Sequence, residues 1–401
     1  MKKFISLLLV FTVMSVSFSF LAFAEYKNQP PSCPGYSIDN QNMTISYINQ
    51  NIPIGQFISD MKNQNEINVT VYKNGQKVIY GYFEVGMTID MHYFDGTFAG
   101  TYTFVAPEIG VITKYNEFLF KKGGISAGWE SPISNVKDFQ LTNDKFNGIL
   151  KFNGDLYLRQ KSQNNWSRIL DGCKQFKLSG NRIGSIQTNG SLVVKDGMYS
   201  TWNTVSTKNI VDFSFDGNRI YMLDSNGNFY VREGISGNTV LLTNNCKSFS
   251  TDGNNICFIT TGGNLYLKQS IYGVWRLICN PVSTVHVDGN RFYAIMGTSK
   301  SFYVKEGVYG TWTLLDKGIN KFQVNDSTIV ALKGTTLNYK QGIKGVWVQS
   351  ATSISDFKLT DTRFACVTLK KELSVKNGVK DNWLSYPYVS YYAAKFDITS
   401  R

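Results

Sequence analysis

The 401-residue sequence has few of the residues that usually build a metal or catalytic centre. It contains two histidines, His92 and His286, and six cysteines, none of which forms a Cys-x-x-Cys pair. Zinc sites are assembled mainly from closely spaced cysteine and histidine ligands, so we expect no such metal site. No Ser/His/Asp arrangement, phosphate-binding loop or Gly-x-Ser-x-Gly motif is present, and we expect no catalytic residues and no cofactor.

Long apolar runs are absent after the first 24 residues. Lys2 and Lys3 precede an apolar run over residues 4–20, and Ala22-Phe23-Ala24 has the pattern of a cleavage site. Residues 1–24 are therefore predicted to be a secretory signal peptide. No later stretch reaches the roughly 18 apolar residues of a membrane-spanning helix. We expect a secreted protein, either extracellular or associated with the cell surface.

Acidic residues are outnumbered by basic ones, 29 against 41, which gives a net charge of +12. Removal of Lys2 and Lys3 with the signal peptide leaves about +10. A basic secreted protein is attracted to anionic polymers, although a positive charge can also serve solubility alone. Nucleic acid is not expected as a partner, because the chain is exported and carries no dedicated binding motif.

The sequence is dominated by a repeat of about 36 residues. Its seven tryptophans are 35 to 37 residues apart, except for one gap of 73 residues. The long gap contains a degenerate copy, in which Thr239 or Val240 stands in place of tryptophan. Eight units result, and each is predicted to contain four short β-strands joined by tight turns such as Asn226-Gly227.

The two ends of the repeat region complement each other. Each unit ends with a strand that is expected to pair with the first strand of the next unit. The first unit begins at residues 109–113 with no such strand before it, and the last unit ends with one at 394–399. Pairing these two strands would remove two free sheet edges. We therefore predict a mainly β fold, a closed β-propeller of about eight four-stranded blades over residues 107–401. The alternative is seven blades, if one unit is not a true blade.

The region before the repeats has a different pattern. Residues 44–106 are predicted to form a small α+β module, with a strand at 44–48, a helix at 54–63, a hairpin at 68–85 and a strand at 102–105. Residues 25–43 contain three prolines and are predicted to be a linker.

Two sets of side chains recur at fixed repeat positions and are the candidate ligand-binding residues. The aromatic set is Trp129, Trp166, Trp202, Trp275, Trp312, Trp347 and Trp383. The basic set is Lys121, Arg159, Lys195, Arg232, Lys268, Lys305, Lys340 and Lys376. The tryptophans either stack on sugar rings or pack between blades. The basic residues either form a ring that binds an anionic polymer, or lie along the blade and pair with acids such as Glu233 and Glu306.

The repeat pattern resembles that of a known class of proteins. The motif (Leu/Phe)-x-Val-Lys-x-Gly, as in Phe302-Tyr-Val-Lys-Glu-Gly307, followed by Gly-x-Trp and Asp-Phe-x-Leu, is similar to repeats of bacterial secreted tectonin- and tachylectin-like β-propellers. The likeness covers residues 109–400 and implies a sugar-binding lectin with similar pockets between neighbouring blades. The unit of this chain is shorter than theirs.

The N-terminal module carries a second resemblance. Val71-Tyr-Lys-Asn-Gly-Gln-Lys-Val78, followed by Val85-Gly-Met87, resembles the small module found next to dockerins in clostridial secreted proteins. No calcium-loop pattern follows it, so the resemblance does not imply dockerin function.

These observations favour a multivalent binding protein that acts as a monomer on a glycan or an anionic cell-wall polymer, with carbohydrate as the leading ligand. Repeated weak sites gain about 10²–10⁴ in apparent affinity when they engage together. One alternative is an extracellular polysaccharide-active enzyme, which would need a matched pair of carboxylates that does not stand out in the sequence. The other is a scaffold at the cell wall that binds proteins.

Overall fold

The structure is a computed structural model that describes residues 31–32, 36–40, 43–47, 53–81, 83, 87–104, 108–122, 128–161, 163–325, 327–360, 363–380, 382–385 and 393–399. The predicted signal peptide and Cys33 lie outside the described residues. The chain divides into two compact units, residues 1–106 and residues 107–400. Within the described residues, no helix is long and apolar enough to cross a membrane.

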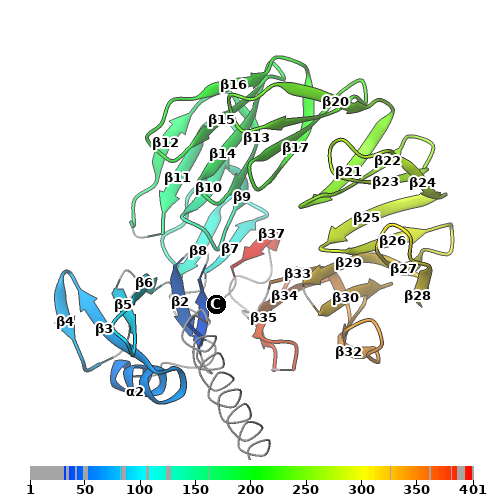
Figure 1. The fold of residues 1–401 in the computed structure, drawn as a ribbon. Helices are drawn as coiled ribbons and strands as arrows, with labels where there is room; N and C mark the ends of the chain where they lie inside the picture. The colour runs from blue at the N-terminus through cyan, green and yellow to red at the C-terminus, as the bar shows by residue number, and fades with distance from the viewer. Residues whose placement is uncertain are drawn as a thin grey trace, which may run out of the picture. The chain divides into compact units, whose positions relative to one another are not determined.

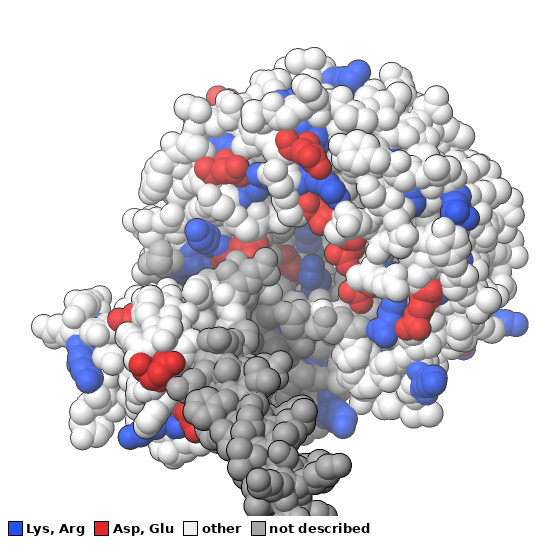
Figure 2. Space-filling model, in the orientation of Figure 1, with Lys and Arg blue, Asp and Glu red and all other residues white. Residues whose placement is uncertain are grey.

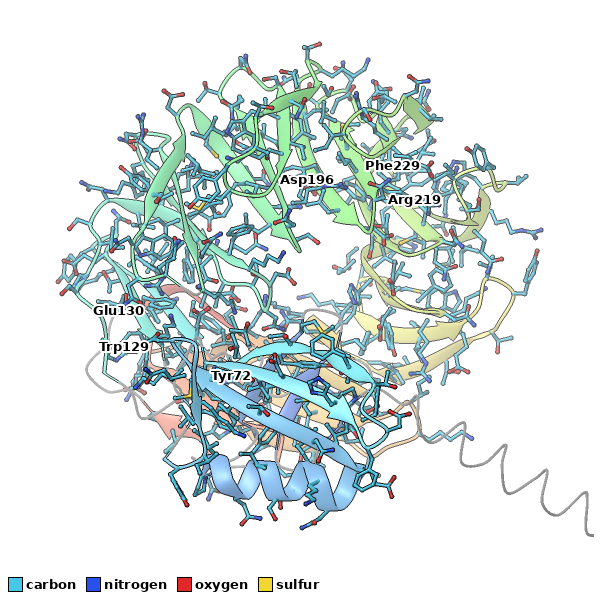
Figure 3. All side chains as sticks on the ribbon, turned by 60° about the vertical axis from the view of Figure 1, so that its left-hand side comes forward. Tyr72, Trp129, Glu130, Asp196, Arg219 and Phe229 are labelled. Atoms are coloured by element: carbon cyan, nitrogen blue, oxygen red, sulfur yellow. The ribbon has the colours of Figure 1, made fainter. Side chains whose placement is uncertain are left out.

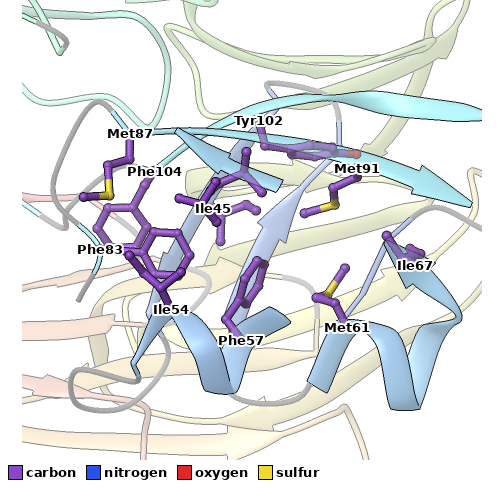
Figure 4. Packing of buried hydrophobic residues seen from close by; sticks show 12 residues of the cluster. Ile45, Ile54, Phe57, Met61, Ile67, Phe83, Met87, Met91, Tyr102 and Phe104 are labelled. Carbon is purple, nitrogen blue, oxygen red and sulfur yellow. The ribbon is translucent and has the colours of Figure 1, made fainter. Parts of the chain in front are cut away.

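The first unit is one six-stranded sheet and one helix, α2 (Ile54–Asn65). Its strands are β1 (Tyr36–Asp39), β2 (Thr44–Tyr47), β3 (Ile67–Lys73), β4 (Gln76–Val78), β5 (Thr88–Tyr93) and β6 (Phe98–Phe104), in the spatial order β1-β2-β6-β5-β3-β4. The helix forms because Ile54, Phe57 and Met61 recur at helical spacing, and all three are fully buried. They pack against apolar side chains of the sheet, which form the core of this unit (Figure 4).

Three details of the first unit differ from the sequence prediction. Residues 36–39, which we assigned to a linker, form β1 and pair with β2. The second strand of the predicted hairpin is shorter and ends at Val78. Strand β5 was not predicted, although its buried residues Ile89 and Met91 alternate with less buried ones as strand residues do.

The second unit consists of eight antiparallel sheets, and we number these blades in chain order. The first blade contains β7 (Glu108–Thr113) and β8 (Phe118–Lys122) with the last strand, β37 (Ala393–Ile398). The second is β9 (Val136–Gln140), β10 (Phe146–Lys151), β11 (Leu156–Gln160) and β12 (Ser167–Leu170); the third is β13 (Cys173–Ser179), β14 (Arg182–Gln187), β15 (Leu192–Asp196) and β16 (Asn203–Ser206). The fourth is β17 (Ile210–Asp216), β18 (Arg219–Asp224), β19 (Phe229–Glu233) and β20 (Thr239–Thr243).

The other four blades follow the same order. The fifth is β21 (Cys246–Asp252), β22 (Asn255–Thr260), β23 (Leu265–Gln269) and β24 (Arg276–Cys279); the sixth is β25 (Val282–Asp288), β26 (Arg291–Met296), β27 (Ser301–Glu306) and β28 (Trp312–Asp316). The seventh is β29 (Ile319–Asn325), β30 (Thr328–Lys333), β31 (Thr336–Gln341) and β32 (Val348–Ala351); the eighth is β33 (Ile354–Leu359), β34 (Arg363–Thr368), β35 (Leu373–Asn377) and β36 (Leu384–Ser385). The blades follow one another around a common centre, with β37 innermost in the first blade and the first strand innermost in each of the others (Figure 1). The predicted mainly β propeller fold is confirmed, with eight blades rather than seven.

The end of the chain completes the first blade. Strand β37 pairs with β7 in antiparallel register, with Phe396 opposite Val111 and Ile398 opposite Ile109. A single bridge between Phe118 and Ile133 stands where the other blades have a fourth strand. The predicted pairing of the last strand with residues 109–113 is confirmed.

Apolar side chains fill the layer between each blade and the next. The layer between the third and fourth blades, for example, contains Ile186 and Leu192 from one and Phe213 from the other. The same kind of layer joins the eighth blade to the first, through Val375 and Ile109. The degenerate fourth unit, which lacks tryptophan, forms a complete blade because its strands still supply these buried residues.

Candidate functional site

The recurring tryptophans are half-buried and pack against the apolar layers between blades. Several of them also form a hydrogen bond to the preceding blade. The indole Nε1 of Trp275 donates to the carbonyl of Leu242 at 3.0 Å, and that of Trp383 donates to the carbonyl of Ser350 at 2.9 Å. These carbonyls lie on the outermost strands β20 and β32. The geometry therefore favours packing between blades, one of the two roles that the sequence left open.

The recurring basic residues are buried rather than exposed. Seven of the eight are between 1% and 8% exposed, and Arg232 is half-buried. In seven blades the cation lies over the ring of the same blade's tryptophan, as Lys268 Nζ does at 4.6 Å from the ring centre of Trp275. Burial lowers the pKa of Lys268 and of Lys195. A buried cation cannot contact an anionic polymer, so these side chains do not form the ring expected for such binding.

The alternative that these basic residues pair with neighbouring acids holds for Arg159, which pairs with Glu130 at 2.9 Å, but not for Glu233 and Glu306. Glu233 and Glu306 pair instead with Arg219 and Arg291, at 3.4 and 3.0 Å. Lys195, Lys268 and Lys376 donate to the backbone of the turn that follows them, as Lys268 Nζ does to the carbonyl of Ile271 at 2.8 Å. A carbonyl that points at a buried ammonium group replaces part of its lost hydration.

The degenerate fourth blade shows what the tryptophan contributes. Arg232 donates to the carbonyl of Ile235 in its own turn at 2.6 Å, as the lysines do in other blades. It also donates to the carbonyl of Val205 on the outermost strand of the third blade, at 3.0 Å. In other blades, the bond to the outermost strand of the preceding blade is made by the indole N–H of the recurring tryptophan. The longer, forked guanidinium therefore links the two blades where no tryptophan is present.

Two turns of each four-stranded blade lie at the same end of the sheet, because consecutive strands run antiparallel. These are the turn between the first and second strands and the turn between the third and fourth strands. Hydrogen bonds join them: Gly197 N–H donates to Asn181, Gly234 to Asn218 and Gly307 to Asn290, each at 2.7 Å to the backbone carbonyl. We call this end of the second unit the turn face.

Three tyrosines stand out on the turn face. Tyr199, Tyr272 and Tyr309 are 83%, 86% and 76% exposed, each three residues before the tryptophan of its blade. Arg276 of the fifth blade lies over the ring of Tyr309 at 4.7 Å. Sequence analysis missed these tyrosines, although a Tyr-x-x-Trp pattern in the third, fifth and sixth units was a signal that could have found them.

A second set of arginines links neighbouring blades on the turn face. Arg182 and Arg219 begin the second strands of the third and fourth blades, and Asp196, the partner of Arg182 at 2.9 Å, ends the third strand of its blade (Figure 3). Arg182 also donates to the carbonyl of Asn218 at 3.2 Å, and Arg219 to that of Gly253 at 3.0 Å. Between the fourth and fifth blades, the turn face contains a cavity of about 390 Å³ beside Arg219.

Part of the charge on the second unit is paired. On the face shown in Figure 2, acidic and basic side chains lie next to one another. Around the centre, Lys177 pairs with Asp212 at 2.7 Å across two innermost strands, and Lys358 pairs with Asp397 at 3.3 Å. These ion pairs neutralise part of the positive charge around the centre of the blades.

The cysteines and His286 are packed residues in this structure. Five described cysteines are free, and burial raises the pKa of Cys173 to about 11 and that of Cys366 to about 12. Burial also lowers the pKa of His286. Among the residues that the structure describes, no group of three or more His, Cys, Asp or Glu could hold a metal ion.

Comparison with known proteins gives similarity of fold. No protein-family model and no curated protein matches the sequence. Two structures of AztD from Citrobacter koseri, one of them of the apo protein, are 12% identical to this chain, cover 74% of it and 97% of their own length, and have a TM-score of 0.55. Hsv2 from Kluyveromyces lactis is 11% identical, covers 66% of this chain and 98% of its own, and has a TM-score of 0.44. The chain is thus similar to AztD in its β-propeller fold.

Proposed function

We propose that this chain is a secreted multivalent carbohydrate-binding protein, of the tectonin- or tachylectin-like kind, whose turn face contacts the sugar. The observation that carries the proposal is the exposure of Tyr199, Tyr272 and Tyr309 at the same position in three blades. A tyrosine offers an apolar ring on which a sugar ring can stack, together with a hydroxyl that can hydrogen-bond. Single exposed apolar residues are common on protein surfaces, but these three share one position in their blades and lie on one face.

The recurring tryptophans and lysines support these tyrosines indirectly. Lys195 donates to the carbonyl of Met198 and Lys268 to that of Ile271, and in each turn the next residue is the exposed tyrosine. The indole beneath the lysine is fixed in turn by its bond to the preceding blade. A rigid turn lowers the entropy lost when a ligand binds to it. The residues that we predicted as direct ligand contacts therefore hold the contact residues in position.

Repetition of the tyrosine suits a ligand with repeated units. Tyr272 and Tyr309 belong to the adjacent fifth and sixth blades. A single stacking contact binds weakly, but two or three contacts to one glycan chain raise the apparent affinity by about 10²–10⁴. We therefore expect weak binding of monosaccharides and much stronger binding of polymers.

Replacing the three exposed tyrosines together, Tyr199→Ala, Tyr272→Ala and Tyr309→Ala, is expected to weaken binding to the preferred glycan about 100-fold, because multivalent contact is lost. The preferred glycan is first identified on an array of neutral and acidic glycans, and its affinity is then measured on immobilised polymer. The thermal unfolding midpoint should change little, since surface side chains of this kind contribute within about 0.5 kcal/mol.

The matched control replaces two exposed aromatic residues at the other end of the blades. Tyr115 and Phe152, which are 62% and 57% exposed, lie in turns between second and third strands. The variant with Tyr115→Ala and Phe152→Ala should bind glycan as the unaltered protein does. The proposal would be contradicted if the unaltered protein bound no glycan on the array, or if this control variant lost as much glycan affinity as the triple tyrosine variant.

A protein-binding scaffold is the second candidate, and one observation favours it. Leu241, Leu277 and Leu314 are 54%, 57% and 44% exposed on the outermost strands of three consecutive blades. Such edges can accept an additional strand from a protein partner. The first unit, with its resemblance to modules beside dockerins, would then serve as the adaptor. Competition separates the two functions: soluble glycan displaces the protein from its target only if the turn face holds it there.

A further inference from the structure

Four polar residues recur together in two blades of the turn face, and we call them the polar quartet. In the fourth blade they are Asp216, Arg219, Tyr221 and Glu233. In the sixth blade the same positions hold Asp288, Arg291, Tyr293 and Glu306. In the third blade the four positions hold Ser179, Arg182, Gly184 and Asp196, so that only the ion pair is kept. Packing between blades explains the arginine–carboxylate ion pair. It does not explain why an aspartate and a tyrosine accompany this ion pair in both the fourth and the sixth blades.

The strand register brings the quartet together. Asp216 is opposite Arg219 on the neighbouring strand, and Arg219 is opposite Glu233 on the next. Tyr221 is two residues after Arg219 on the same strand, so its side chain is on the same face of the sheet. The register of the sixth blade is the same, with Asp288 opposite Arg291 and Arg291 opposite Glu306.

The quartet of the fourth blade opens into the cavity of about 390 Å³ between the fourth and fifth blades. Asp216, Arg219 and Glu233 line it, together with residues of two turns, Gly217, Asn218, Gly253 and Asn254. Arg219 is held at the wall by its bond to the carbonyl of Gly253, at 3.0 Å. A depression of this volume, open to solvent, can accommodate a small ligand such as one sugar residue.

One carboxylate oxygen of the quartet has no partner in the protein. Asp216 Oδ2 is buried and accepts no hydrogen bond. Burial raises the pKa of Asp216, a hydrogen bond from the backbone N–H of Gly253 lowers it, and the nearby Asp252 raises it. A buried carboxylate oxygen is costly unless a donor reaches it. Asp216 lines the cavity, so a ligand hydroxyl group that enters it lies beside this carboxylate.

The balance of charge selects the class of ligand. Two carboxylates and one guanidinium leave the cavity wall with an excess of negative charge, to which Asp252 adds. A ligand carboxylate or sulfate would be repelled, whereas the hydroxyls of a neutral sugar can donate to Asp216 and Glu233. The same hydroxyls can accept from Arg219 and from the amide of Asn254. Charged partners make the stronger of these hydrogen bonds.

The cavity is close in the fold to one of the exposed tyrosines. The N–H of Ser270 donates to the carbonyl of Asn254 at 2.6 Å, which ties the tyrosine-bearing turn of the fifth blade to the cavity wall. Tyr272 follows two residues later. A glycan that stacks on Tyr272 therefore has a polar cavity within its reach on the same face.

We propose that the cavity at the polar quartet of the fourth blade binds a neutral sugar residue and discriminates against acidic sugars. The inference rests on the proposed carbohydrate-binding function and specifies its sugar class. That class also differs from the anionic polymer that the net charge left open as a ligand.

The test uses the full chain and the variants Glu233→Gln and Asp216→Asn, with Asp196→Asn as the matched control. Asp196 occupies the position of Glu233 in the third blade and also pairs with an arginine, Arg182 at 2.9 Å. The probes are neutral tetramers of N-acetylglucosamine and of mannose, and the acidic tetramer of galacturonic acid, titrated calorimetrically at about 0.15 M salt. At least one neutral tetramer should bind about 10-fold more tightly than the acidic one. Glu233→Gln and Asp216→Asn should each weaken it about 10-fold, whereas Asp196→Asn should change it less than twofold.

Two results would overturn the inference and leave the proposed function standing. They are a preference for the acidic tetramer, and equal affinities of the Glu233→Gln and Asp196→Asn variants, in a protein whose tyrosine variant still loses glycan binding. Absence of binding to every glycan, by contrast, would remove the proposed function and the inference with it. Thermal unfolding of each variant establishes that a loss of binding is not a loss of folding.

Discussion

A chain that ends at residue 392 is expected to lose the cooperative unfolding of its second unit. Deletion of β37 removes the partner strand of β7 and uncovers Ile109 and Val111, which are fully buried in the complete chain. It also removes Asp397, which accepts a hydrogen bond from Leu141 N–H at 3.1 Å and so ties the first blade to the second. The expected loss is comparable with the whole stability of a domain, about 5–15 kcal/mol.

Urea unfolding followed by tryptophan fluorescence measures this loss, and size-exclusion chromatography shows whether the free edge of β7 causes association. A chain that ends at residue 399 is the matched control, because it keeps all of β37 and should unfold as the complete chain does. Equal urea midpoints for the two truncated chains would show that the last strand does not hold the first blade in place.

Replacing Trp275 by alanine is expected to destabilise the second unit by about 3 kcal/mol, at the low end of the range for tryptophan because the side chain is half-buried. The substitution removes packing against the layer between the fourth and fifth blades and the hydrogen bond to Leu242. It also removes the ring beneath the buried ammonium group of Lys268, which worsens the cost of burying that charge.

Tyr272→Ala is the control for this substitution, since it removes an aromatic ring three residues away that is 86% exposed. We expect it to change the free energy of unfolding by less than about 0.5 kcal/mol, while weakening glycan binding. The opposite pattern would place the structural role on the tyrosine and the binding role on the tryptophan. Chemical denaturation of both single variants distinguishes these outcomes.

The sequence was sufficient to predict the blades, for a physical reason. Each blade is a chain of hairpins between neighbouring segments, and tight turns such as Asn226-Gly227 define them locally. Because the repeat of about 36 residues occurs eight times, the same set of hairpins forms in each unit. The pairing of β37 with β7 was predictable because the first unit begins without a preceding strand, and the last unit ends with a strand of the missing kind.

The roles of the recurring side chains were harder to predict. Periodicity shows that Lys268 and Trp275 share positions with other units, but it does not show which groups they contact. The bond from Trp275 to Leu242 joins residues 33 positions apart, so it exists only once the blades are packed around the centre. Burial of a lysine depends on that packing, which the sequence does not show. A ring of basic residues that binds an anionic polymer therefore remained possible from the sequence.

Features present in only some units were missed for a different reason. The exposed tyrosines occur in three units and the polar quartet in two, so neither is prominent in a search for shared positions. The strand β1 was missed because it has four residues and follows a segment rich in proline. Features that depart from the repeat are the places where a binding site can differ from its neighbours.

The most direct test of the account is a crystal structure of the protein soaked with the neutral oligosaccharide that binds it most tightly. The account predicts a sugar ring stacked on Tyr272 or Tyr309, a second sugar residue in the cavity beside Arg219, and Trp275 still bonded to Leu242. A ligand bound at the opposite end of the blades, or stacked on a tryptophan that has left its place between blades, would contradict it.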